Sequence, residues 1–389
     1  MAPEKVFIPT KLTMLTILFA STLILMGGAA VAPALPQIQA AFPDVDPMII
    51  DMVVTLPPLA IAVTGLMIGL MADRFGKVKV LIPSLLIFGI AGTSGFFIDD
   101  IWLLLVSRFF VGVGIAGILS CCTALITEYY QGSQRVKILG YQTAAMGLGV
   151  LILETGGGIL AEYGWHQPFL IYTLGFLIFF MGIVSLREPS KEHFDGQMGS
   201  DKFNKKAIIV CYAAAFILMV ILFCIPTKLA TFVAETTDAS STMTGILLGL
   251  NGVLNSAMCL AYRRISMSIP RYYILSIGFL LMAGGLIMFQ IANDVPTILL
   301  CTCLIGMGIG LGTTTIINTL STNVSPSKSG AIMGGYGTAL NLGQFSATFV
   351  IAALITMSGS LRGMYVSMGF IALIAAIIFF IALPKVDKN

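Results

Sequence analysis

Five ionisable side chains interrupt long apolar stretches of this 389-residue chain, and they are its first candidates for chemistry. They are Asp51, Arg108, Glu128, Glu154 and Lys228. An ionised group in apolar surroundings is costly unless it is paired, hydrated or neutralised by a proton. Each of the five is therefore a candidate for an ion pair or for proton transfer, and Glu154 is the carboxylate that lies deepest in its stretch.

The apolar stretches themselves are typical of helices that cross a membrane. Apolar residues make up 57% of the chain and charged residues 10%, whereas a soluble domain is about one quarter charged. One crossing needs about 20 mostly apolar residues. The sequence therefore predicts an all-α integral membrane protein with twelve transmembrane helices. We expect them at residues 12–34, 48–71, 79–98, 101–127, 138–161, 168–186, 207–231, 243–262, 272–292, 295–320, 330–356 and 363–384.

A polar segment separates the twelve predicted helices into two sets of six. Residues 188–206 are rich in Gly, Ser and charged side chains, a composition typical of a linker. The sequence thus predicts an N-terminal six-helix bundle over residues 1–187, a cytoplasmic linker, and a C-terminal six-helix bundle over residues 207–389.

Short motifs recur at nearly the same spacing in the two halves. Residues 140–144, Gly-Tyr-Gln-Thr-Ala, return as residues 335–339, Gly-Tyr-Gly-Thr-Ala. Residues 112–115, Gly-Val-Gly-Ile, return as residues 306–309, Gly-Met-Gly-Ile. Because each half has an even number of helices, a duplication would give both halves the same topology, with a binding site expected where they meet.

The basic residues predict how the chain is oriented. With the N-terminus inside the cell, all but three of the 21 lysines and arginines lie in inner loops or tails. The exceptions are Arg108 and Lys228, within helices, and Arg362, in an outer loop. Positive charge is enriched on the cytoplasmic side of membrane proteins. We therefore expect a multi-pass protein of the cell's inner (plasma) membrane with both termini in the cytoplasm.

The loop at residues 69–79 carries the most specific motif. It reads Gly-Leu-Met-Ala-Asp-Arg-Phe-Gly-Lys-Val-Lys and joins two predicted helices. With this loop, twelve helices and a central linker, the chain resembles the major facilitator superfamily. Residues 108–114 resemble a fourth-helix motif of its drug–proton antiporter branch.

The resemblance implies a conformational gate at the cytoplasmic ends of the helices. In this interpretation Asp73 faces the start of the eleventh helix near Ser329, where the helix dipole favours a carboxylate, and Glu128 at the end of the fourth helix lies level with the loop. The expected gate residues are Gly69, Asp73, Arg74, Gly76, Lys77 and Glu128.

One departure from the antiporter pattern concerns the fifth helix. Antiporters usually carry Gly-Pro, two further residues and Gly-Gly there, whereas this chain has Leu153-Glu154 in place of Gly-Pro before Gly157 and Gly158. The departure weakens the inference of antiport from resemblance, and it places a carboxylate inside the membrane.

Arg108 and Glu154 are expected at similar depths in consecutive helices. At about 1.5 Å per residue, each would lie roughly 10 Å from the outer end of its helix. They could form a permanent ion pair that ties the two helices together, or a titratable site in which protonation of Glu154 releases Arg108. The sequence leaves both interpretations open, and together these two residues are the proton-coupling candidates.

Polar residues within the helices suggest a substrate cavity. Lys228 follows Pro226 near the outer end of the seventh helix, where it could line the cavity or extend to the membrane surface; Asp51 is expected at that surface. The candidate cavity residues are Gln142, Lys228, Asn251, Asn255, Asn318, Asn341 and Gln344.

These features favour a secondary active transporter that moves a small organic solute by alternating access. The resemblance favours proton-coupled efflux of amphipathic, drug-like compounds, with multidrug resistance as the expected phenotype. The alternative is an organic-anion uniporter or exchanger that uses Arg108 and Lys228. We expect no enzyme, because the two histidines lie in polar loops and no nucleotide-binding loop is present. The expected partners are a small-molecule substrate, protons and lipid, with no nucleic acid, cofactor or metal, and the protein is expected to be a monomer.

Overall fold

The computed structural model describes residues 9–189, 204–324 and 329–387, and in these ranges the chain is built from helices. Eleven helices are long and apolar enough to cross a membrane, and a bent pair at the N-terminus, Lys11–Leu23 with Met26–Ala41, makes a twelfth crossing with a 55° bend. The predicted twelve-helix membrane fold in two six-helix bundles is thereby confirmed.

The N-terminal bundle contains the elements before the linker. They are α1 (Lys11–Leu23), α2 (Met26–Ala29), η1 (Ala32–Ala34), α3 (Leu35–Ala41), α4 (Pro47–Phe75), α5 (Lys77–Ser94), α6 (Ile101–Tyr129), α7 (Gly132–Ala161), η2 (Gln167–Thr173) and α8 (Leu174–Ser185). The first crossing is broken at Ile24 and Leu25, between α1 and α2, and the short helix η1 has a proline in its first turn.

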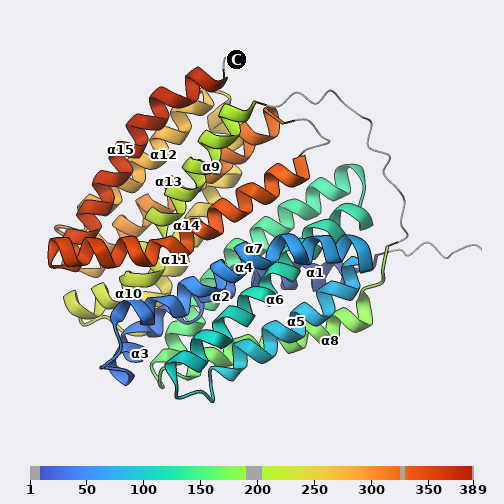
Figure 1. The fold of residues 1–389 in the computed structure, drawn as a ribbon, viewed down its shortest axis with the longest axis horizontal. Coiled ribbons are helices and arrows are strands. Elements are labelled where there is room, and N and C mark those ends of the chain that lie inside the picture. The colour runs from blue at the N-terminus through green and yellow to red at the C-terminus, as the bar shows by residue number, and fades with distance from the viewer. Residues whose placement is uncertain (1–8, 190–203, 325–328, 388–389) are drawn as a thin grey trace, which may run out of the picture.

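The C-terminal bundle repeats the same plan. Its elements are α9 (Lys205–Leu222), α10 (Cys224–Thr236), α11 (Ser241–Ser266), α12 (Arg271–Met288), α13 (Val295–Thr322), α14 (Ser329–Ser358) and α15 (Leu361–Asp387). Figure 1 shows the two bundles side by side, the first in blue to green and the second in yellow-green to red. The predicted boundaries of the two halves stay a prediction, and most of the linker, residues 190–203, lies outside the described residues.

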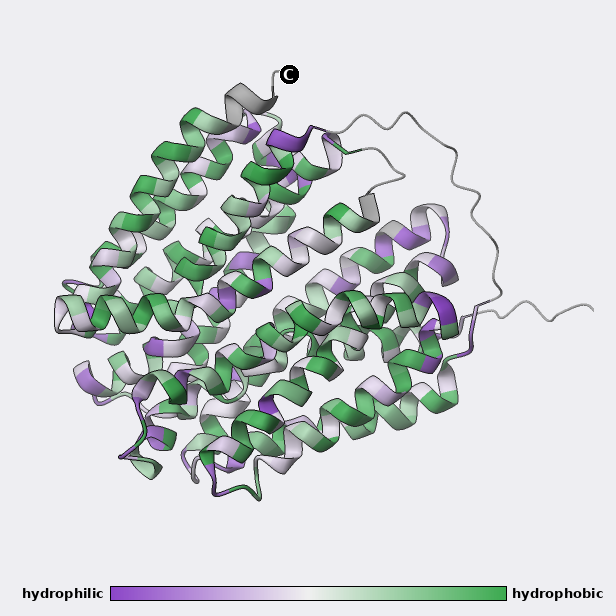
Figure 2. Cartoon of the chain, viewed as in Figure 1, coloured by the Kyte–Doolittle hydropathy of each residue, from purple (hydrophilic) through white to green (hydrophobic). Residues whose placement is uncertain are grey.

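The helices of both bundles run between two ends of the molecule. The linker end is where α8 ends and α9 begins, and the far end is the opposite one, where α3 packs beside α10 (Figure 1). Hydrophilic residues gather toward both ends of the helices, and hydrophobic residues cover their middles (Figure 2). This pattern is the one a bilayer imposes on spanning helices.

Acidic residues at the far end start three of the spanning helices. The carboxylates of Asp46, Asp100 and Asp294 accept hydrogen bonds of 2.8 Å from the backbone amides of Met48, Leu103 and Thr297. Such N-caps satisfy amides that the first turn of a helix leaves free. These three aspartates therefore fix where α4, α6 and α13 begin.

The two bundles meet mainly where α7 packs against α11 and α4 against α14. Glycines allow the first pair to approach closely. A Cβ atom on Gly158 would lie 2.3 Å from the carbonyl oxygen of Ser241, and one on Gly245 would lie 2.3 Å from the carbonyl oxygen of Glu154. The backbones of α7 and α11 therefore touch at the far end, which leaves no room there for side chains between them.

Candidate functional site

A central cavity of about 390 Å³ lies between the two bundles. Its walls are mostly apolar, and they come from α2 and the residues just before it, α4, α6 and α7 on one side and from α9–α11, α13 and α14 on the other. The polar groups in the lining are Glu154, Asn251, Asn255, Ser256, Thr313, Asn341 and Gln344. An apolar pocket with a few convergent polar groups is the usual form of a small-molecule site.

Glu154 brings the negative charge to this cavity. Its residue is only 6% exposed, and its Oε2 atom is buried with no hydrogen-bond partner among the described residues. The side chain projects from α7, the helix that packs along α11 of the other bundle. A buried carboxylate without a cation favours binding either a proton or a positively charged ligand.

Amide side chains of the C-terminal bundle line the cavity wall that faces the N-terminal bundle. Asn251 donates a 2.9 Å hydrogen bond to the carbonyl of Thr302, and Asn341 donates one of 2.8 Å to the carbonyl of Gly337. Gln344 lies 3.5 Å from the sulfur of Met219. Four of the seven predicted cavity residues thus line the cavity, namely Asn251, Asn255, Asn341 and Gln344.

The other three predicted cavity residues lie outside its lining. Gln142 is buried in the N-terminal bundle, where it donates a 2.8 Å hydrogen bond to the hydroxyl of Ser21. Asn318 is exposed near the linker end of α13. Lys228 is engaged in an ion pair at the far end. An amide in a spanning helix can serve packing as readily as a cavity, and the sequence does not distinguish the two.

Arg108 does not meet Glu154. The guanidinium is fully buried in the N-terminal bundle, and it donates to the carbonyls of Ala91 (3.2 Å) and Gly92 (3.1 Å) at the end of α5. Its Cζ lies 4.8 Å from the ring centroids of both Phe169 and Tyr172. Similar depth in consecutive helices did not bring the two charges together, because α7 packs mainly along α11 and α1 and has little contact with α6.

The sequence analysis did not predict the buried ion pair between the two bundles. Lys228 Nζ lies 2.8 Å from Asp51 Oδ2, and the side chains are 8% and 4% exposed. Asp51 was expected at the membrane surface because it lies only one turn into its helix. Burial occurs because α4 and α10 belong to different bundles that close over it, which distance along the chain does not reveal.

The predicted gate residues cluster at the linker end. Lys77 forms ion pairs with Glu128 (2.5 Å) and with Asp73 (3.7 Å), and Arg74 lies over the ring of Phe75. A Cβ atom on Gly69 would have one neighbour within 4 Å, the hydroxyl oxygen of Ser120 at 3.9 Å. The expected contact of Asp73 with the start of α14 stays a prediction, since the side chain is 74% exposed and residues 325–328 lie outside the described ranges.

Gly76 joins α4 to α5 in a conformation that favours glycine, with φ at +115°. The space beside it is filled by the carboxylate of Glu188, which accepts hydrogen bonds from the amides of Lys77 (2.6 Å) and Val78 (3.1 Å). Glu188 thus caps α5 from the segment that follows α8. The sequence offered no signal for this contact beyond a carboxylate close after the sixth helix.

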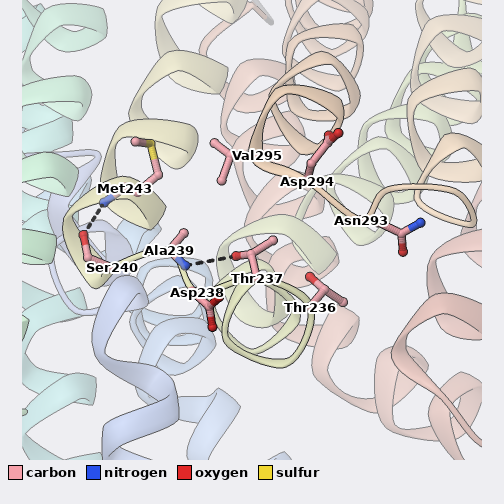
Figure 3. A pocket seen from close by; sticks show the side chains of 9 residues that line it. All are labelled: Thr236, Thr237, Asp238, Ala239, Ser240, Met243, Asn293, Asp294 and Val295. Carbon is pink, nitrogen blue, oxygen red and sulfur yellow. Dashed lines mark hydrogen bonds between the residues drawn. The ribbon is translucent and has the colours of Figure 1, made fainter.

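A second pocket lies at the far end of the C-terminal bundle, where the loop after α10 meets the start of α13 (Figure 3). Two of its polar groups hold helix starts: Ser240 accepts from the amide of Met243, and Asp294 accepts from that of Thr297. Hydrogen bonds from the side chain and the amide of Thr297 also hold the pKa of Asp294 below its usual value. The hydrogen bonds described in this pocket therefore serve the starts of the helices.

Comparison with known proteins gives a consistent family. Quinolone resistance protein NorA of Staphylococcus aureus (strain COL) is 23% identical over 293 residues, which cover 74% of this chain and 75% of NorA. Niacin transporter NiaP of Acinetobacter baylyi is 31% identical over 120 residues, 31% of this chain and 27% of NiaP.

A solved structure covers nearly the whole molecule. The bacterial homologue of the human lysosomal transporter Spinster, in an inward-facing and occupied conformation, superposes with a TM-score of 0.77 at 17% identity, over 96% of each chain. The Major Facilitator Superfamily profile matches residues 17–348 and 211–389. This chain therefore belongs to the Major Facilitator Superfamily of membrane transporters.

Proposed function

We propose that this protein exports a small amphipathic organic solute across the cytoplasmic membrane by alternating access, and that Glu154 couples the export to protons. The observation that carries the proposal is the isolated carboxylate of Glu154 in an otherwise mostly apolar cavity between the bundles. A proton or a cationic solute could neutralise this group, so the two would compete for it. Competition of that kind gives antiport when the carrier changes state only with the site occupied.

The chemistry of the cavity favours a cationic amphipathic solute. Apolar side chains would hold its body, Glu154 its positive charge, and Asn255, Asn341 and Gln344 its polar groups. The similarity to NorA, whose name records quinolone resistance, agrees with a drug-like substrate. Substrate and proton coupling are our proposal for this chain, as are its action as a monomer without catalytic activity and its independence of nucleic acid.

The conformation supports access from the cytoplasm. The bundles are joined at the far end by hydrogen bonds between Gln37 and Ser241 (2.9 Å) and between Thr55 and Thr348 (2.5 Å). With the cytoplasmic linker predicted from the distribution of lysine and arginine, the far end is the outer one. The cavity would then be closed to the outside and would take its solute from the inside.

The alternative organic-anion carrier would need a cation at the cavity. Arg108 and Lys228 both lie outside the lining, and each is engaged elsewhere, Arg108 with carbonyls and Lys228 with Asp51. The lining residues described in the structure include a carboxylate and no lysine or arginine. These observations favour the cationic solute.

The test is solute-induced proton flux in proteoliposomes that contain a pH-sensitive dye. Cationic, neutral and anionic compounds would be compared for wild type, Glu154→Gln and, as a matched control, Glu162→Gln, whose carboxylate lies outside the cavity. We expect a cationic compound to move protons in wild type and Glu162→Gln, and the signal to be lost in Glu154→Gln. Solute movement without a proton signal, or an unchanged Glu154→Gln, would refute coupling through Glu154.

A further inference from the structure

The ion pair between Asp51 and Lys228 joins the two bundles at the far end. Asp51 belongs to α4 of the N-terminal bundle and Lys228 to α10 of the C-terminal bundle. Their charged atoms are 2.8 Å apart, and both side chains are more than nine-tenths buried. We name these two residues the far-end ion pair.

The far-end ion pair lies directly beyond the central cavity. Val54, one turn after Asp51, lines the cavity, and so does Pro226, two residues before Lys228. In the same layer the hydroxyl groups of Thr55 and Thr348 meet at 2.5 Å between α4 and α14. The pair therefore belongs to the wall that separates the cavity from the far end.

Alternating access requires this wall to open. The bundles then move apart at the far end, so Asp51 and Lys228 must separate and become hydrated. In the closed state each charge neutralises the other at a buried place. Removing one charge alone would leave the second buried and uncompensated, which is strongly unfavourable, whereas removing both leaves no charge to hydrate.

We propose that the far-end ion pair makes the balance between the closed and the open far end depend on charge matching: either charge alone opposes closure, and the two together permit it. The inference rests on alternating access within the proposed function and on no property of the solute or of Glu154. It assigns Lys228 to the gate and not to the substrate. Its signature is non-additivity: either single neutralisation favours the open far end, and the second neutralisation reverses the effect of the first.

The test is hydrogen–deuterium exchange, read by mass spectrometry, of the full-length protein in lipid nanodiscs without solute or proton gradient. Peptides from residues 46–56 and 224–236 report on the far end, and peptides from residues 69–80 and 258–268 on the linker end. The variants are Asp51→Asn, Lys228→Gln, the double variant, and the exchange Asp51→Lys with Lys228→Asp.

We expect each single variant to take up more deuterium at the far end and less at the linker end. The ratio of open to closed far end should rise by roughly tenfold or more. The double variant and the charge exchange should return close to wild type. Single variants that match wild type, or a double variant as strongly shifted as the singles, would overturn the proposal.

A single variant that loses its fold would show faster exchange at both ends. The double variant then decides, because it carries the same two substitutions without an unpaired charge. Wild-type exchange in the double variant would support charge matching, and fast exchange at both ends would refute it. Since no solute is present, a failure of proton coupling through Glu154 would leave this result untouched.

Discussion

The buried charged side chains of this protein are accommodated in three different ways, and each way indicates a different role. Asp51 and Lys228 neutralise each other across the bundles. Arg108 lies against carbonyl oxygens and two aromatic rings inside one bundle, away from the cavity lining, and its Nη1 has no hydrogen-bond partner among the described residues. Glu154 faces the cavity with an oxygen that no described group binds. A charge whose partner must come from solution is the one suited to transport.

Arg108 is predicted to stabilise the N-terminal bundle. In Arg108→Ala the carbonyl of Gly92 loses the arginine donor, that of Ala91 keeps the hydroxyl of Ser94, and the rings of Phe169 and Tyr172 lose the group packed against them. We expect a loss of about 2–4 kcal/mol of stability from an unpaired acceptor and lost packing. Thermal unfolding of the purified protein measures it.

The comparison for Arg108 is Glu154→Gln, which removes a charge from the cavity without breaking a described hydrogen bond. It should unfold at about the wild-type temperature while losing proton coupling. A wild-type melting temperature for Arg108→Ala would contradict a structural role of the arginine.

Residue types in the sequence identified the carboxylate of the cavity but not the partners of the charges. Glu154 could be singled out because a glutamate in an apolar helix is costly wherever it lies. The structure does not bring Glu154 to Arg108, since depth along a helix says nothing of the direction in which a side chain points. The pairing of Asp51 with Lys228 depends on how two distant halves meet, which the local sequence does not contain.

At the scale of elements, the contact between α7 and α11 depends on glycines at the far end. A Cβ on Gly245 would meet the carbonyl of Glu154 at 2.3 Å, whereas a Cβ on Gly334 of α14 would meet nothing within 4 Å. Gly245→Ala should therefore push the helices apart and cost about 1–3 kcal/mol in the closed far end.

Gly334→Ala is the matched control for Gly245→Ala. It should be neutral or add up to about 1 kcal/mol, because alanine favours a helix over glycine. Thermal unfolding of the two variants side by side gives the contrast. Equal melting temperatures for Gly245→Ala and Gly334→Ala would mean that α7 and α11 can move apart without a loss of stability.

The contact between Glu162 and α11 should not depend on pH in the physiological range. The pKa of Glu162 is lowered by hydrogen bonds from the hydroxyl of Thr242, the side chain of Ser240 and the amide of Thr242. A carboxyl with a lowered pKa gives its full stabilisation above its ordinary pKa of about 4.3, and loses it only as the pH falls through the lowered value.

We therefore expect Glu162→Gln to show the wild-type pH profile of transport between about pH 5 and pH 8. Glu154→Gln should flatten that profile instead. Initial rates of solute movement in proteoliposomes at a series of pH values would compare the two. A profile that changes with Glu162→Gln and not with Glu154→Gln would assign the proton site to the far end.

For the whole molecule, composition, span length and the central polar segment were sufficient to predict the fold. The described residues contain eleven apolar crossings and a bent pair that makes the twelfth, and the bend at Ile24 and Leu25 is the main feature that length alone did not predict. Hydropathy reports where the chain meets lipid. It does not report which of the alternating states the two bundles adopt, since both states bury the same helices in the membrane.

The far-end closure offers a direct test of movement between the bundles. Thr55 and Thr348 lie on α4 and α14, and their hydroxyl oxygens are 2.5 Å apart. Cysteines at both positions, Thr55→Cys with Thr348→Cys, would bring two sulfur atoms within reach of a disulfide. Oxidation should hold the far end closed and stop transport, and a reductant should restore it, because alternating access requires each end to open in turn.

Each single cysteine variant is the control for this lock, since it has no partner across the interface and should keep its activity under the same oxidant. The native cysteines described at the interior, such as Cys121 and Cys224, are buried and remain common to all variants. Transport that persists while mass spectrometry shows the Thr55→Cys–Thr348→Cys disulfide intact would mean that solute leaves by another route. Reversible arrest would instead tie transport to separation of α4 from α14, the same motion that must break the far-end ion pair.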